Sequence, residues 1–147
     1  LGMPATTLEP GAVPAERLAH GYRWEDEQWK EEPPLPDGAF GPMGGMLTSI
    51  TDLGRYVGFL MGAWPPRDAP DDGPVTRASV REMQQLQRFA GASMFAGNDA
   101  LTLNAGGYGY GLRVGQDCLF RHWVSHTGGL PGLLAQAADL TPFIHAS

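Results

Sequence analysis

The chain has 147 residues, of which 42% are hydrophobic and 18% charged, so it is long enough for one buried core and too apolar to be disordered. Its net charge is −6 with no basic cluster, which argues against a nucleic-acid partner, and no apolar run approaches the length of a membrane-spanning helix. The single cysteine excludes an internal disulfide. The sequence begins neither with Met nor with a signal peptide, so we expect the chain to be a piece of a longer protein.

The first third of the chain is expected to be largely irregular. Prolines interrupt residues 1–22, a short strand is predicted over 20–24, and the acidic, proline-rich stretch 25–38 is typical of an exposed loop. Gly44-Gly45 marks a bend or a close backbone approach. The 21 glycines and 13 prolines of the chain favour many such loops.

The clearest local structure is a helix predicted over residues 50–61. Ser49 precedes Asp52 by three residues, which is a variant of the capping box. Gly54 and Gly58 lower helix propensity by about 1 kcal/mol each relative to alanine, so packing must hold the helix, and we expect another element to pack closely there. One apolar stripe follows helical spacing: Leu53, Tyr56, Val57 and Leu60.

The second half of the chain predicts one helix and a β-hairpin. The helix spans 76–89, with Thr76 as N-cap and Ser79 as the alternative cap. The candidates for its inner face are Val80, Met83, Leu86 and either Gln87 or Phe89. Residues 90–106 are small and polar and indicate a long loop. Strands are expected over 107–114 and 119–127, with the turn at 115–117.

The segment 123–132 carries the candidate site. It begins as a strand of β-branched and aromatic residues, and Leu130-Pro131-Gly132 then forces a turn. Between them the His126 imidazole, the Thr127 hydroxyl and the bare backbone at Gly128 and Gly129 suit a carbonyl or carboxylate docked along the strand. An ordinary strand that ends in a glycine turn is the simpler interpretation of this segment taken alone.

Six short segments come one after another in the order of a known family's motifs. They are Leu1-Gly2-Met3, His20-Gly21-Tyr22, Gly44-Gly45-Met46-Leu47-Thr48-Ser49 leading into Asp52-Leu53, Ser79-Val80-Arg81-Glu82-Met83, Tyr108-Gly109-Tyr110-Gly111-Leu112 and His126-Thr127-Gly128-Gly129. None is specific alone. Together they resemble the serine β-lactamase and penicillin-binding-protein superfamily, in particular its class C-like branch of esterases and D-aminopeptidases.

This resemblance implies an α+β fold of the α/β-sandwich type, with an antiparallel sheet and flanking helices. His126-Thr127-Gly128 would take the place of the family's Lys-Thr-Gly box. Thr127 would orient a substrate carboxylate or carbonyl, and the Gly129 amide would be one oxyanion donor. Histidine in place of lysine replaces a permanent charge by one only partly present at neutral pH, which favours an esterase- or peptidase-like relative over a true β-lactamase.

The family's Ser-x-x-Lys and Tyr-x-Asn motifs do not occur in the chain. Its one lysine, Lys30, has Glu27 three residues before it. We therefore expect residues 1–132 to be the C-terminal portion of a β-lactamase-related domain and 133–147 a truncated or divergent tail. In this tail 133–140 fits a short helix, and no further strand is expected.

The function that the resemblance implies is part of a serine hydrolase. It would act through an acyl-enzyme on ester or amide substrates of β-lactam, D-peptide or carboxylester type, and the chain alone would be inactive. The expected partners are that small-molecule substrate and a separate N-terminal segment carrying the nucleophile; no nucleic acid, membrane span, cofactor or metal is predicted, and no compartment is favoured.

Three rival interpretations stay open at this point. His122 and His126 have the spacing of zinc ligands on a helix, but on a strand four residues span about 13 Å, too far for one ion. Cys118 is a weak candidate nucleophile because no partner base is evident. A non-catalytic binding or structural module that keeps the fold without the chemistry is the third.

Overall fold

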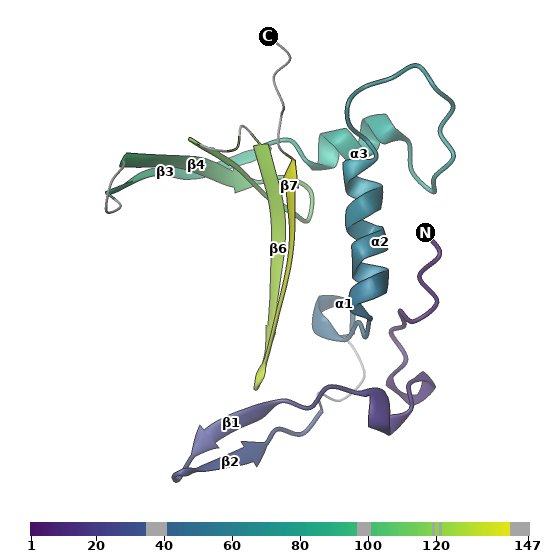
Figure 1. The fold of residues 1–147 in the computed structure, drawn as a ribbon, viewed down its shortest axis with the longest axis vertical. Helices are drawn as coiled ribbons and strands as arrows, with labels where there is room; N and C mark the ends of the chain where they lie inside the picture. The colour runs from purple at the N-terminus through teal and green to yellow at the C-terminus, as the bar shows by residue number, and fades with distance from the viewer. Residues whose placement is uncertain (35–40, 97–100, 119, 121, 142–147) are drawn as a thin grey trace. The chain divides into compact units, whose positions relative to one another are not determined.

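The structure, a computed structural model, describes residues 1–34, 41–96, 101–118, 120 and 122–141 (Figure 1). These residues divide into two compact units. The hairpin unit comprises Gly2–Arg55 with Thr127–Gln136, and the sheet unit comprises Tyr56–His126 with Leu1 and Ala137–Ser147. No helix among the described residues is long and apolar enough to cross a membrane.

Helices and antiparallel strands are mixed along the chain, which confirms the predicted α+β fold class. Strands β1 and β2 pair antiparallel, and the other strands form a five-stranded sheet in the order β3-β4-β5-β6-β7, antiparallel wherever the register from β3 to β6 is defined. In chain order the elements are η1 (Pro10–Ala12), η2 (Ala15–Arg17), β1 (Tyr22–Glu25), β2 (Gln28–Glu31), α1 (Gly41–Gly44), α2 (Ile50–Met61), α3 (Arg77–Met83), β3 (Arg88–Ala96), β4 (Leu101–Tyr108), β5 (Arg113–Asp117), β6 (His122–Leu130) and β7 (Leu133–Thr141).

Helix α2 confirms the sequence prediction in its bounds and its cap. The Asp52 backbone N–H donates to Ser49 Oγ over 3.2 Å. Of the predicted apolar stripe Leu60 is buried, and its other members are half-buried. The expected close packing at Gly54 and Gly58 is wrong, because no described neighbour comes within 4 Å of a Cβ placed at either residue.

The Asp52 side chain ties the N-terminal segment to the start of α2 rather than closing a local capping box. Its Oδ2 accepts the Ala5 backbone N–H at 2.7 Å and the Thr6 hydroxyl at 3.0 Å. Its Oδ1 accepts Arg55 Nη1 at 2.6 Å. Next to this contact Thr7 and Leu47 exchange two backbone hydrogen bonds of 2.9 Å. A carboxylate that is only 1% exposed therefore joins segments about 47 residues apart.

The core of the sheet unit lies where the second half of α2 meets α3 and the start of β5. Leu60, Ala63, Val80 and Leu112 are buried there, and Tyr56, Phe59 and Trp64 pack against them. Burial raises the pKa of the Tyr56 hydroxyl above its ordinary value. Val114 in β5 pairs with Val124 in β6, and both side chains are buried.

The helix predicted over 76–89 ends early, at Met83. The Thr76 side chain caps it as predicted, accepting the Ser79 backbone N–H. Gln84 then ends the helix: it is fully buried, Nε2 donates to the Leu60 carbonyl at 3.0 Å, and Oε1 accepts Trp64 Nε1 at 3.1 Å. Leu86 and Phe89, two of the predicted inner residues, are exposed instead.

The long loop predicted over 90–106 is wrong, because most of it forms β3 and β4. Met94 pairs with Leu103 in a register broken by an irregularity near Phe89. At that irregularity a Cβ on Gly107 would lie 1.9 Å from the Arg88 carbonyl oxygen, so the strand pair requires glycine there. Small alternating residues carried too little hydrophobic signal to reveal these strands.

Two further predictions on turns and tails are wrong. Residues 115–117 belong to β5, and the reversal comes after them, closed by the Phe120 N–H donating to Asp117 Oδ1 at 2.7 Å. The possible helix at 133–140 is strand β7, which pairs beside β6 and covers an edge expected to stay open. The exposed loop predicted over 25–38 holds β2, and its residues 35–38 lie outside those described.

Candidate functional site

The predicted site residues lie on one strand. His126, Thr127, Gly128 and Gly129 occupy consecutive positions near the end of β6, and all four are exposed. The prediction that this segment forms a β-strand is therefore confirmed. We call these four residues, 126–129, the box.

Pairing with the neighbouring strand ends where the box begins. Strand β5 pairs with β6 at Gly115↔Trp123, Val114↔Val124 and Arg113↔Ser125. Buried Val124 anchors this paired part, and a Cβ on Gly115 would lie 2.2 Å from the Trp123 ring, so glycine at 115 is what lets Trp123 fit. The box comes directly after the last β5 partner, so on the β5 side its backbone has no strand partner among the described residues, and backbone groups along such an edge can pair with an extended ligand.

The His126 ring stands against an aromatic ring from β4. The ring centroids of Tyr108 and His126 are 6.5 Å apart at 73°, an edge-to-face arrangement. Behind His126 a small cavity of about 30 Å³ is lined mainly by apolar residues of the sheet unit, among them Leu60 and Val124. The sequence placed Tyr108 in the strand predicted over 107–114 and in one of the resembling segments, but it did not predict this contact.

The far end of β6 packs on glycines from distant parts of the hairpin unit. A Cβ on Gly44 would lie 3.2 Å from Leu130 Cδ2, and one on Gly21 would lie 2.5 Å from the Pro131 carbonyl oxygen. Gly132 has φ +70°, and a Cβ there would lie 2.3 Å from the Tyr22 backbone nitrogen. Two of the segments that carry the resemblance thus meet at the turn after the box.

The box glycines differ from the other glycines of the six resembling segments. Gly2 and Gly111 have positive φ. A Cβ on Gly21, Gly44, Gly45 or Gly109 would come within 3.2 Å of a neighbour. A Cβ on Gly128 meets nothing within 4 Å, and one on Gly129 makes an ordinary 3.5 Å contact with Leu134, neither residue having positive φ. Backbone conformation or packing within the described chain explains the other glycines but not these two.

The rival sites of the sequence analysis find little support in the geometry. His122 Nε2 donates to the Gln84 carbonyl at 2.7 Å, and its ring lies 6.0 Å from that of Trp64. Among the residues that the structure describes, no three His, Cys, Asp or Glu side chains gather as a metal site would require. The sole lysine, Lys30, is held by Glu25 and Asp26 on the β1–β2 hairpin.

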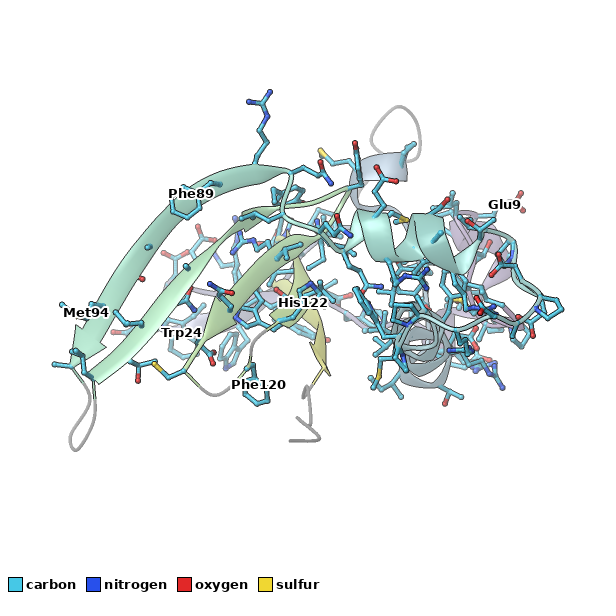
Figure 2. The ribbon with its side chains drawn as sticks, turned by 90° about the horizontal axis from the view of Figure 1, so that it is seen from above. Glu9, Trp24, Phe89, Met94, Phe120 and His122 are labelled. Carbon is cyan, nitrogen blue, oxygen red and sulfur yellow. The ribbon has the colours of Figure 1, made fainter. Side chains whose placement is uncertain are left out.

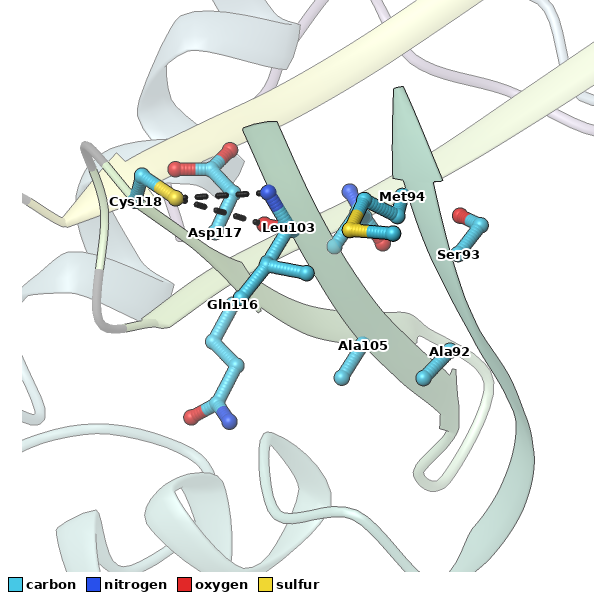
Figure 3. Close-up of a pocket in the computed structure, with 9 residues that line it drawn as sticks. Ala92, Ser93, Met94, Leu103, Ala105, Gln116, Asp117 and Cys118 are labelled. Carbon is cyan, nitrogen blue, oxygen red and sulfur yellow. Dashed lines mark hydrogen bonds between the residues drawn. The ribbon is translucent and has the colours of Figure 1, made fainter. Parts of the chain in front are cut away.

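Cys118 lines a cavity of about 510 Å³ on the β3–β4–β5 face of the sheet (Figure 3). Its Sγ accepts the Leu103 backbone N–H at 3.3 Å. Met94, Leu103 and two alanines make much of the wall, and the nine described lining residues include no Lys, Arg or His. The described wall of this cavity therefore brings no imidazole or amine to the thiol, whose hydrogen bonds run to the backbone of Leu101 and Leu103.

These features define an α+β protein whose sheet presents a short polar box on an exposed strand, with glycine-mediated packing at the strand's end. The model of the Beta-lactamase family matches residues 1–138. The chain therefore belongs to the β-lactamase family, as its six segments predicted. Searches of curated proteins and of solved structures find no match.

Proposed function

We propose that the chain supplies the third box of a serine hydrolase that acts on ester or amide bonds through an acyl-enzyme. Family membership supports hydrolase chemistry. The observation that carries the proposal is the pair Gly128 and Gly129, exposed glycines that neither backbone conformation nor packing among the described residues requires. A carbonyl group brought against this strand would need that bare backbone.

The proposed chemistry is acyl transfer. A serine oxygen supplied from outside these 147 residues attacks the substrate carbonyl carbon, and the carbonyl π electrons move onto oxygen to give a tetrahedral oxyanion. The Gly129 N–H is one of the donors that hold this oxyanion, and a typical donor contributes about 10²–10³ in rate. Collapse of the intermediate breaks the ester or amide bond, and the leaving alcohol or amine takes up the proton that a base removed from the serine. Water then hydrolyses the acyl-enzyme, which releases the acid and restores the serine.

Thr127 and His126 orient the substrate in this proposal. The Thr127 hydroxyl donates to a carboxylate or carbonyl beside the scissile bond. The His126 imidazole, held edge-to-face with Tyr108, stands where the family's box has lysine. Because this box lacks the permanent charge of a lysine, it favours esters and peptides over penicillin-type carboxylates.

A complementation assay tests the proposal. The purified chain hydrolyses p-nitrophenyl esters no faster than a control protein, because no Ser-x-x-Lys is present. Mixing with a segment of a β-lactamase-family protein that carries Ser-x-x-Lys and Tyr-x-Asn restores turnover, and His126→Ala or Thr127→Ala then lowers it at least about tenfold. Thr102→Ala, on β4 and outside the box, serves as the matched control and changes turnover less than about twofold.

A non-catalytic module is the second candidate, supported by the absence of Ser-x-x-Lys from the sequence. A fluorophosphonate probe separates the two. Labelling of the added segment together with restored turnover supports the hydrolase. Labelling of that segment without turnover, although the two pieces bind each other, supports the non-catalytic module. Serine-probe-sensitive turnover by the 147 residues alone contradicts both.

A further inference from the structure

The β1–β2 hairpin (Figure 1) has its aromatic residues at register positions of one face. Side chains alternate along a strand, so Tyr22 and Trp24 point to the same side, and the register sets Trp29 directly opposite Trp24. The two indoles are 59% and 68% exposed, and Tyr22 is also exposed. Figure 2 shows the Trp24 side chain among the sticks.

The two indoles meet in a geometry that leaves ring faces open. Their centroids are 5.3 Å apart at 68°, so the edge of one ring meets the face of the other. Such a pair stabilises a two-stranded hairpin, which is marginal by itself. Both tryptophan residues stay highly exposed beside this contact.

The cations of the hairpin lie on its other face and are already paired. Arg23 and Lys30 oppose each other in the register, one residue away from each tryptophan. Arg23 Nε lies 3.1 Å from Glu32, and Lys30 Nζ lies 2.9 Å from Glu25. Hydrogen bonds to Asp26, the larger cause, and to Glu25 raise the pKa of Lys30. The Lys30 side chain therefore stays charged and paired with these carboxylates.

The aromatic face carries a carboxylate and no permanent cation of the described hairpin. Glu31 shares that face with Trp29 and opposes Tyr22, and its carboxylate contacts His20 Nδ1. The hairpin as a whole, residues 20–32, holds five carboxylates against two permanent cations, so its field attracts positive charge.

We propose that Tyr22, Trp24, Trp29 and Glu31 form a binding surface for an arginine side chain of a peptide or protein partner. A planar guanidinium stacks on an indole face, where the ring quadrupole attracts it, while its N–H groups donate to the Glu31 carboxylate. An exposed contact of this kind contributes modestly, so the surface serves a partner that brings several such contacts or needs fast release. The surface is independent of the proposed hydrolase chemistry.

Fluorescence anisotropy with a labelled five-residue peptide, Gly-Arg-Gly-Arg-Gly, tests the proposal. The intact chain binds this peptide, and binding weakens at least about fivefold when citrulline, which is neutral and similar in shape, replaces both arginines. Trp24→Leu and Trp29→Leu each weaken binding about fivefold, and Glu31→Gln weakens it to a similar extent. Trp24→Tyr keeps an aromatic ring and stays within about threefold, which separates loss of the ring from loss of the hairpin.

The matched control removes the same charge from the opposite face. Glu32→Gln deletes a carboxylate next to Arg23 and leaves arginine-peptide binding within about twofold, because that face carries no aromatic ring. Equal losses for Glu31→Gln and Glu32→Gln with no effect of the tryptophan variants would show general charge attraction and overturn the proposal. So would equal affinity for the citrulline peptide, or no binding.

Discussion

Removal of the Asp52 carboxylate gives the clearest test of what stabilises the hairpin unit. This carboxylate is 1% exposed and accepts hydrogen bonds from the Ala5 N–H and the Thr6 hydroxyl, whereas its ionic partner Arg55 has a side chain 46% exposed. A hydrogen bond to a charged group contributes about 1.5–3 kcal/mol, and a half-exposed ion pair adds at most about 1 kcal/mol. Because the two hydrogen bonds share one oxygen, we expect Asp52→Ala to lower the free energy of unfolding by about 3–5 kcal/mol.

Urea unfolding followed by circular dichroism measures this loss, with an unchanged slope as the condition for comparing midpoints. Asp52→Asn keeps one acceptor oxygen and is expected to lose about half as much as the alanine variant. Asp68→Ala, in an exposed loop, is the matched control and changes stability by less than about 0.5 kcal/mol. A loss below about 1 kcal/mol for Asp52→Ala would refute the view that this carboxylate holds the N-terminal segment to α2.

Two further predictions concern packing around the site. Leu60→Ala, in the buried core, is expected to cost about 2–5 kcal/mol in urea unfolding, whereas Ile50→Ala on the same helix, 84% exposed, costs less than about 0.5 kcal/mol; similar values would show that the inner face of α2 is misassigned. Gly132→Ala combines positive φ with a clash at the Tyr22 nitrogen and is expected to cost more than about 2 kcal/mol. Gly128→Ala is expected to stay within about 0.5 kcal/mol, and a loss comparable to that of Gly132→Ala would mean that packing does require glycine at 128.

Local chemistry made α2 and the box strand predictable. A serine cap before an apolar stripe at helical spacing fixes a helix within a dozen residues, and Ser49 and Leu60 behave as that pattern requires. The run Trp123-Val124, with glycines after it, indicated a strand because β-branched and aromatic residues favour strands. The fold class was predicted from the order of six segments, each too short to be specific alone.

Structure that depends on distant partners escaped prediction. Strands β3 and β4 consist largely of small residues, and each becomes a strand because the other supplies its hydrogen bonds. Strand β7 resembled a short helix because alanine and leucine favour helices, and pairing beside β6 overrides that preference. The sequence pattern assigned the Asp52 side chain to the local cap with Ser49, whereas this side chain accepts hydrogen bonds from residues about 47 positions earlier.

The family's short segments therefore have two different roles in this chain. Gly21 and Gly44 close around the turn after β6, and Gly109 fits under the Met83 carbonyl, so these glycines fix the backbone that carries the box. Glycine at 128 and 129 serves no such contact with any residue that the structure describes. Packing thus fixes the backbone of this strand, whereas its exposed end has no side chain at two positions. Such an exposed end is suited to receive a group from outside the described residues. This contrast is why the proposed site rests on the box and not on the other motifs.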